Sequence, residues 1–132
     1  MWATDISAAA VAVARANTRR LGLSGRVRCA VADLLPPSPR RFDVVVANIL
    51  ADPLVLLAPV LAARVGSRGR IALSGILAGQ AGDVIAAYER WFTLAVWRSL
   101  DGWVLLAGAR RDVARSGFPG GSADGALQGK PD

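Results

Sequence analysis

A stretch in the first half of the chain decides the fold. Residues 42–54 read FDVVVANILADPL. The valines at 44–46 follow one another without polar alternation, which is typical of a strand covered on both faces, as in a parallel sheet. Asp52 and Pro53 are typical of an N-cap and a first helical turn, and we expect this helix to continue to Arg64. The stretch therefore predicts a strand that leads directly into a helix.

The alternation of strand and helix extends in both directions from this stretch. Upstream, a strand over residues 2–6 precedes a helix over residues 8–21, with Ser7 as its N-cap and Gly22 as its C-terminal stop. The other expected elements are a strand at 27–31, a kink at Pro59, a turn at 66–69, a strand at 70–74 and an amphipathic helix at 80–91. This order predicts an α/β fold.

The C-terminal part of the chain changes pattern. Strands are expected at 93–100 and 103–109, and Asp101-Gly102 between them is a strong hairpin signal. We therefore expect a mainly parallel, Rossmann-like sheet that ends in an antiparallel hairpin and occupies residues 1–111. Residues 112–132 are rich in glycine, serine and aspartate, and they predict a disordered tail.

The composition limits the classes of function. The chain is 53% hydrophobic and 20% charged, as in a globular domain. Its net charge is +6, and almost all of its basic residues are arginines. The arginine pairs lie at the ends of predicted elements, where local electrostatics favours them. No aromatic residues alternate with them as in a base-stacking surface. We favour a solvated surface over a nucleic-acid contact face and expect no direct nucleic-acid binding.

Metal sites and membrane spans are not expected. The sequence has no histidine and one cysteine, so neither a zinc spacing nor a disulfide framework exists. The longest apolar stretch, residues 44–63, is interrupted by Asn48, Asp52 and two prolines, which argue against a membrane helix. Asp5 lies where a signal peptide would carry basic residues. We therefore expect a soluble protein of the cytoplasm.

Three polar residues mark the ends of predicted strands, where ligands bind in open α/β sheets. Asp5 could accept hydrogen bonds from the two hydroxyls of a ribose, or only stabilise the helix that follows it. Asp33 could accept one from an adenine amino group, or only cap its loop. Asn48 carries both an acceptor and a donor, so it could face a cofactor on one side and an amine on the other.

Asn48 is the strongest of these candidates. Its amide lies in an apolar run, and a buried amide without partners costs on the order of 1–3 kcal/mol. We expect a ligand to be one of the partners that satisfy it.

Several segments resemble the ribosomal protein L11 methyltransferases, a family of class I S-adenosylmethionine-dependent methyltransferases. Residues 3–7 and 12–17 are similar to the second motif of that class, which many of its subfamilies share, and the resemblance extends over about residues 1 to 110. The more specific matches are Phe42–Leu54, Leu73–Leu77 with Gln80, and Gly102–Leu106. Asn48 is followed by Ile49-Leu50-Ala51 and not by Pro-Pro-Tyr, which disfavours the related release-factor glutamine methyltransferases and the nucleic-acid amino-methyltransferases.

The resemblance implies methyl transfer from S-adenosylmethionine to amino groups of ribosomal protein L11. It implies that the cofactor-binding residues are Asp5, Ile6, Asp33 and Asn48, with Asp5 at the ribose hydroxyls. Asn48 would be the catalytic residue, at the methionine end of the cofactor and the incoming amine. Ile49 and Leu50 would form an apolar wall beside the methyl group and bind the substrate.

The sequence lacks one part of that family's pattern. A strand, a glycine-rich turn and a helix precede the Asp5 strand in complete domains of the class, and nothing in these 132 residues resembles them. In the family's sheet the missing strand lies between the strands that end at Asp5 and Asn48. We therefore expect this chain, as a partial domain, either to pair those two strands directly or to leave open edges. We also expect it to be marginally stable alone and to bind S-adenosylmethionine weakly or not at all.

Two alternatives remain at this point. One is a non-catalytic remnant or interaction module derived from a methyltransferase. The other is a fragment of a nicotinamide-dependent oxidoreductase, in which Asp5 would also hold a ribose. The segment Asn48-Ile49-Leu50 and the terminal hairpin have no natural role in such an oxidoreductase.

Overall fold

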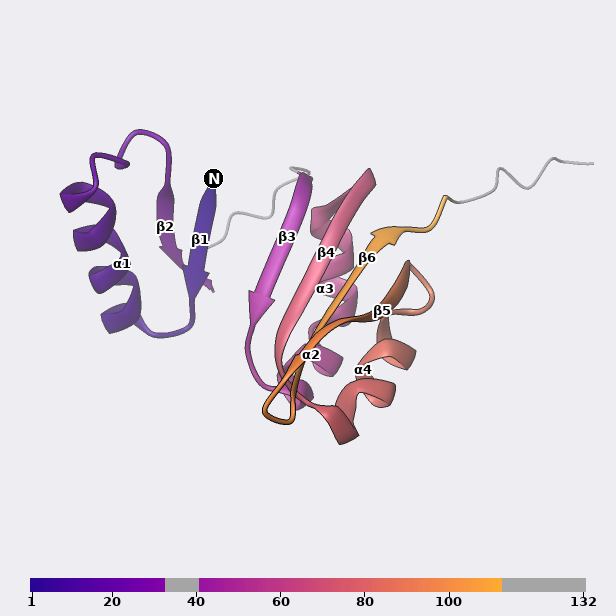
Figure 1. Ribbon diagram of the computed structural model, residues 1–132. Helices are drawn as coiled ribbons and strands as arrows, with labels where there is room; N and C mark the ends of the chain where they lie inside the picture. The colour runs from indigo at the N-terminus through magenta and orange to yellow at the C-terminus, as the bar shows by residue number, and fades with distance from the viewer. Residues whose placement is uncertain (33–40, 113–132) are drawn as a thin grey trace, which may run out of the picture. The chain divides into compact units, whose positions relative to one another are not determined.

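The computed structural model describes residues 1–32 and 41–112, which form parts of two compact units (Figure 1). Unit 1 is Met1–Arg40 and unit 2 is Arg41–Asp132. The predicted disordered tail, residues 112–132, lies outside the described residues apart from Asp112.

Unit 1 is a strand–helix–strand motif. Strand β1 (Trp2–Asp5) pairs in parallel with β2 (Arg28–Val31), and helix α1 (Ala8–Arg20) connects them. The predicted caps of α1 are confirmed. The Ser7 side chain accepts a hydrogen bond from the backbone N–H of Ala10 at 3.3 Å, and Gly22 follows the helix with a φ of 67°.

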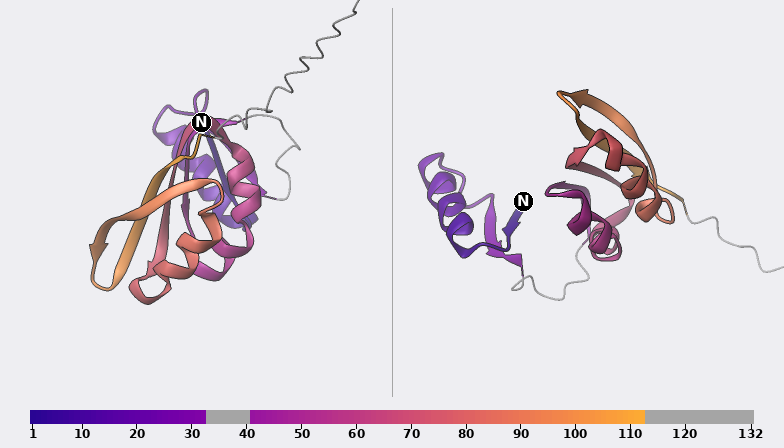
Figure 2. Two further views of the ribbon diagram at one scale, coloured as in Figure 1. Left: turned by 90° about the vertical axis from the view of Figure 1, so that its right-hand side faces the viewer. Right: turned by 90° about the horizontal axis from the view of Figure 1, so that it is seen from below.

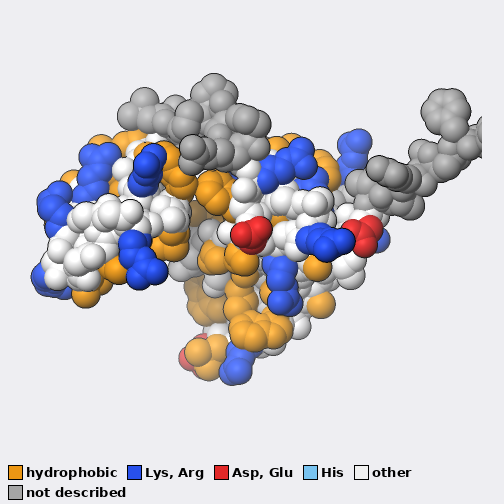
Figure 3. Space-filling model, turned by 90° about the horizontal axis from the view of Figure 1, so that it is seen from above, with side chains coloured by type: hydrophobic (Ala, Val, Ile, Leu, Met, Phe, Trp, Pro, Cys, Tyr) orange, Lys and Arg blue, Asp and Glu red, His pale blue; other side chains and the backbone are white. Residues whose placement is uncertain are grey.

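One side chain of α1 forms hydrogen bonds to the sheet of unit 1. Arg15 donates from Nε and Nη2 to the carbonyl of Cys29, at 3.3 and 3.0 Å. Val11 is the one buried hydrophobic residue in the described part of this unit. Hydrophobic side chains therefore remain at its surface among the arginines (Figure 3).

Unit 2 is a four-stranded sheet with helices. The strand order is β3-β4-β6-β5, with β3 parallel to β4 and β6 antiparallel to both of its neighbours. In chain order the elements are β3 (Phe42–Asn48), α2 (Ala51–Leu56), α3 (Ala58–Arg64), β4 (Val65–Leu77), the 3-10 turn η2 (Ala78–Gln80), α4 (Ala81–Tyr88), β5 (Phe92–Leu100) and β6 (Trp103–Arg110). The expected α/β fold with a C-terminal antiparallel hairpin is confirmed, and the sheet of unit 2 is mixed, with one parallel and two antiparallel pairs of strands.

The core of unit 2 lies between the helices and one face of this sheet (Figure 2). Leu54, Ile71, Leu73, Ile76 and Leu106 are among its fully buried side chains. Other members are the buried residues Ala51, Ala58, Ala62, Val65, Ala81, Val84, Tyr88, Phe92 and Val104. The helices therefore pack on the sheet through a continuous apolar cluster.

Two polar contacts join the elements around that core. The buried Tyr88 hydroxyl of α4 donates to the carbonyl of Leu54 in α2 at 2.8 Å, and burial raises the pKa of Tyr88 to about 12. Arg110 of β6 donates to the carbonyls of Ala62 and Val65 at the end of α3, at 2.6 and 3.1 Å. Both contacts satisfy backbone acceptors at helices that flank β3 and β4.

Within unit 2 taken by itself, β3 is covered on one face, whereas the sequence predicts cover on both. Val45 packs against the core, but Val44 is 58% exposed and Val46 is 72% exposed. The helices of unit 2 cover one face only, so alternate valines remain on the open face.

Three predicted boundaries also differ. Leu50 is the N-cap of α2 and Asp52 lies inside the first turn, where its charge still favours the helix N-terminus. The helix breaks at Leu57 ahead of Pro59, which agrees with the predicted kink. Strand β4 includes the predicted turn at 66–69 as an irregularity in its pairing with β3. Helix α4 is shorter than residues 80–91.

The hairpin prediction is confirmed. Asp101 and Gly102 have φ angles of 48° and 81°, as a two-residue turn of the primed type requires. The two strands it joins bring Trp103 back to the end of β4, opposite Leu77. Taken by itself, unit 1 has the β1–β2 pair, and in unit 2 β3 pairs with β4 at the end of the strand order.

Candidate functional site

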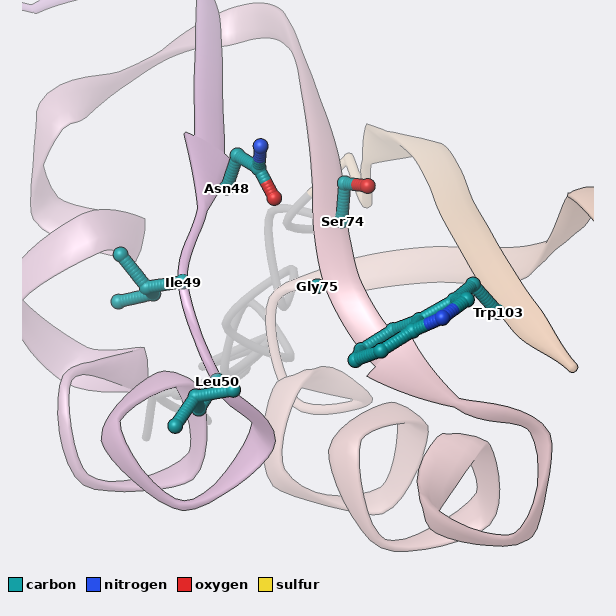
Figure 4. A pocket seen from close by; sticks show the side chains of 6 residues that line it. All are labelled: Asn48, Ile49, Leu50, Ser74, Gly75 and Trp103. Atoms are coloured by element: carbon teal, nitrogen blue, oxygen red, sulfur yellow. The ribbon is translucent and has the colours of Figure 1, made fainter.

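The candidate site is a pocket at the carboxyl ends of β3 and β4 (Figure 4). Its volume is about 470 Å³, and the residues that line it are Asn48, Ile49, Leu50, Ser74, Gly75 and Trp103. Asn48 is the last residue of β3, and Ile49 and Leu50 connect it to α2. The pocket therefore opens where α/β sheets bind ligands.

The pairing of the strands explains why these side chains meet. Asn48 lies opposite Ser74 in the parallel register of β3 and β4. Trp103 lies on β6 opposite Leu77, and its ring extends toward Gly75 (Figure 4). The result is a pocket with an amide and a hydroxyl on one side and apolar surface around them.

The burial argument for Asn48 is corrected by the structure. Asn48 is exposed, and within the described residues its side chain makes no hydrogen bond. Water can therefore form hydrogen bonds with the amide, and the amide does not need a ligand to avoid a desolvation cost. Its candidacy now depends on its place in the pocket and not on a buried polar group.

The apolar neighbours of Asn48 are exposed as well. Ile49 is 38% exposed and Leu50 is 65% exposed. Both line the pocket, so the structure brings together three of the residues that the sequence proposed for one end of the site.

The other candidates belong to unit 1. Asp5 ends β1, and its Oδ1 accepts a hydrogen bond from the backbone N–H of Ser7 at 2.8 Å. This is the helix-stabilising role considered above, and it uses one of the two carboxylate oxygens. Ile6 is 84% exposed. Asp33 lies outside the described residues.

Sequence reasoning did not propose Ser74, Gly75 or Trp103 as site residues, although each lies in a segment used for the family resemblance. The sequence did contain a signal for Ser74, because Ser74 is the last residue of the predicted strand 70–74, and it pairs with Asn48 at the end of β3. Trp103 could not be placed from sequence, because its position depends on how the hairpin returns along β4.

No metal or membrane feature is found in the parts of the chain that the structure describes. No group of three or more histidine, cysteine, aspartate or glutamate side chains there could hold a metal ion. Within residues 1–32 and 41–112, no helix is long and apolar enough to cross a membrane.

The fold defines the class of protein. Parallel strands with polar residues at their carboxyl ends, followed by an antiparallel hairpin, form part of the sheet of class I methyltransferases. The crystal structure of ribosomal protein L11 methylase from Lactobacillus delbrueckii subsp. bulgaricus is similar, with a TM-score of 0.69 and 32% identity over 83% of this chain and 57% of that one. An RNA methyltransferase from Salinibacter ruber, in complex with S-adenosyl-L-homocysteine, shares the fold with a TM-score of 0.59 and 19% identity over 82% of this chain and 63% of that one.

The family follows from the sequence comparisons. The model of the ribosomal protein L11 methyltransferase (PrmA) family matches residues 1–111, and the chain belongs to this family. The ribosomal protein L11 methyltransferase of Paraburkholderia xenovorans is 46% identical over 112 residues, 85% of this chain and 36% of that protein. That of Burkholderia cenocepacia is 48% identical over 108 residues, 82% of this chain and 35% of that protein. The chain thus spans about a third of the length of these relatives.

Proposed function

We propose that this chain supplies part of an S-adenosylmethionine-dependent N-methyltransferase that acts on amino groups of ribosomal protein L11. The observation that carries the proposal is the pocket at the ends of β3 and β4, which is lined by Asn48, Ile49 and Leu50 among others. Family membership over residues 1–111 supports the class of reaction and the cofactor.

The residues present fit one end of such a cofactor. The pocket combines an amide, a hydroxyl and exposed apolar side chains, which suits the methionine portion and the methyl group beside it. We assign Asn48 to the methionine end, and Asp5 and Ile6 to the ribose. Asp33 is assigned to the adenine side. Among the described residues, Ser7 bonds to one carboxylate oxygen of Asp5, and the other oxygen is a second acceptor.

The chemistry asks little of the protein beyond positioning. When bound, the cofactor would supply both the methyl group and, from its sulfonium, a good thioether leaving group, and the amine that accepts the methyl group would lose its proton to water. None of the six residues that line the pocket is titratable, so the contribution of the chain is orientation of a neutral amine. In this role Asn48 Oδ1 accepts a hydrogen bond from the amine N–H.

The partner and location follow from the substrate. A protein amine is the proposed acceptor, and neither nucleic acid nor metal is required for the transfer. Ribosomal proteins are made in the cytoplasm, so we propose that the enzyme works there.

A domain exchange tests the proposal. This chain would replace the matched 112-residue region of the Paraburkholderia enzyme, and transfer of labelled methyl groups to purified L11 would be measured. We expect an active chimera, and we expect Asn48→Ala to lower kcat/KM at least about tenfold, which corresponds to about 1.4 kcal/mol of transition-state stabilisation. Asn17→Ala, the same change on the exposed surface of α1, should leave kcat/KM unchanged.

The alternative of a non-catalytic remnant predicts a different result. A chimera that folds and binds S-adenosylhomocysteine but transfers no methyl group would support that alternative. The given 132 residues by themselves are a separate case, because no segment of their sequence resembles the glycine-rich first motif of the class. In calorimetric titration we expect no micromolar binding of S-adenosylmethionine by this chain, and such binding would overturn that expectation.

A further inference from the structure

Gly75 interrupts β4 at the pocket. Leu73 pairs with Leu106 and Ile76 pairs with Val104, so Ser74 and Gly75 together lie opposite the single residue Leu105. Two residues against one is a β-bulge, and the φ of 84° at Gly75 is the left-handed conformation that such a bulge favours in glycine. Bulges of this kind change the direction of side chains next to a site.

The bulge lies against the end of β3. A Cβ atom built on Gly75 would lie 2.4 Å from the carbonyl oxygen of Ile49 and 2.9 Å from its carbonyl carbon. It would also lie 3.2 Å from Oδ1 of Asn48. The two shortest contacts are to backbone atoms, which cannot rotate away as the end of a side chain can. No side chain therefore fits at position 75 unless the Asn48–Ile49 segment moves.

The bulge also decides which side chains share a face. Without the extra residue, Ile76 would follow Ser74 on the open face of the sheet. With it, Ile76 stays fully buried in the core while Ser74 remains at the pocket beside Asn48. Gly75 thus links the core packing of β4 to the lining of the pocket.

From this geometry we infer that Gly75 is a positioning residue, which allows the backbone of Asn48 and Ile49 to approach β4 closely and so fixes the Asn48 amide in the pocket. The role of Gly75 in catalysis rests on the proposed function, whereas the close approach of the backbone at Gly75 does not depend on that function. Restoring ordinary contact around a Cβ would move the Ile49 carbonyl by about 1 Å, and a misplacement of that size at a reacting centre can cost about 100-fold in rate.

The chain offers a matched control. Gly102 has nearly the same backbone conformation, with a φ of 81°, but nothing lies within 4 Å of a Cβ built there. Gly75→Ala and Gly102→Ala therefore share the strain of a positive φ, and only the first adds a collision with the backbone of Ile49 just after β3. A difference between the two variants isolates the close approach.

The test uses two-dimensional ¹H–¹⁵N NMR of the full chain. We expect the side-chain amide of Asn48 and the backbone amides of Ile49 and Leu50 to shift by more than a line width in Gly75→Ala. Gly102→Ala should leave these three signals in place. In the active chimera described above, Gly75→Ala should lower kcat by about 10- to 100-fold, and Gly102→Ala should change it less than twofold.

The wild-type chain provides a check that needs no variant. The Gly75 Hα protons should show nuclear Overhauser contacts to the Asn48 side chain, because the Cβ position lies 3.2 Å from Asn48 Oδ1. Absence of these contacts, or unchanged Asn48 and Ile49 signals in Gly75→Ala, would overturn the inference. If Gly75→Ala does not fold, the wild-type contacts decide. If the wild-type chimera transfers no methyl group, the proposed function fails while the NMR result on Gly75 stands.

Discussion

The two units of this chain use the same strand–helix–strand pattern but differ in what they bury. Among the described residues, unit 2 has a cluster of fourteen buried hydrophobic side chains, and unit 1 has Val11 alone. Hydrophobic burial is the main favourable contribution to folding. The comparison teaches that an α/β pattern in the sequence does not by itself provide a core, because the pattern must also find a second layer to pack against.

Unit 1, described by itself, leaves several large hydrophobic side chains exposed. Ile6 is 84% exposed, Val13 61% and Leu21 66%. Its sheet has two strands and packs against one helix, and Val11 is the one buried hydrophobic side chain of the unit among the described residues. The hydrogen bonds from Arg15 to Cys29 are between exposed groups, so they add little to the stability of unit 1.

The largest expected difference is in amide hydrogen exchange. We expect the amides of Ile71 and Leu73, in the interior strand β4, to exchange on the order of 100-fold or more slowly than those of Cys29 and Ala30 in β2, because exchange follows the stability of each cooperative unit. The measurement is exchange of the whole chain followed by NMR. Equal protection in β2 and β4 would show that unit 1 gains stability which its own burial does not explain.

A pair of leucine substitutions measures the same contrast in free energy. Leu73 is fully buried, and Leu73→Ala should lower the free energy of unfolding by about 2–5 kcal/mol through lost burial and a cavity. Leu21 is 66% exposed, and Leu21→Ala should change it by less than about 0.5 kcal/mol. Urea unfolding followed by circular dichroism gives both values. Similar losses would mean that Leu21 is covered in solution.

Local signals in the sequence predicted the elements of both units well. Ser7 and Gly22 delimit α1, and Asp101-Gly102 makes the hairpin turn, because caps and turns depend on neighbouring residues. The coverage of β3 was not predictable in the same way. Three consecutive valines indicate a strand that can be buried on both faces. Whether other elements cover Val44 and Val46 depends on residues elsewhere in the sequence.

The candidate site was predictable in part for a similar reason. Asn48, Ile49 and Leu50 are contiguous, so the motif identifies them together. Ser74 and Trp103 reach the pocket through strand register, and the bulge at Gly75 shifts that register by one residue. A bulge is not visible in an alternation pattern until the pairing partner is known, so this half of the pocket required the structure.

The smallest expected effect is a loss of stability of unit 2 at high pH. Tyr88 is the only tyrosine of the chain and lies in unit 2. Burial raises its pKa to about 12, against about 10 when unfolded. The folded pKa is the higher one, so the stabilisation of the neutral phenol is complete below pH 10 and is lost as the pH rises toward 12. The full loss is on the order of 2–3 kcal/mol.

Tyr88→Phe provides the control for this titration. It removes the bond to the Leu54 carbonyl, so it should lower the free energy of unfolding at neutral pH by about 0.5–1.5 kcal/mol. Its stability should then lack the part of the decline above pH 10 that Tyr88 causes in the wild type. Urea midpoints at intervals from pH 8 to pH 12, together with the absorbance of the phenolate, give both curves. Parallel curves for the two proteins would show that the phenol is open to water, and therefore that α4 does not seal the core of unit 2 against α2.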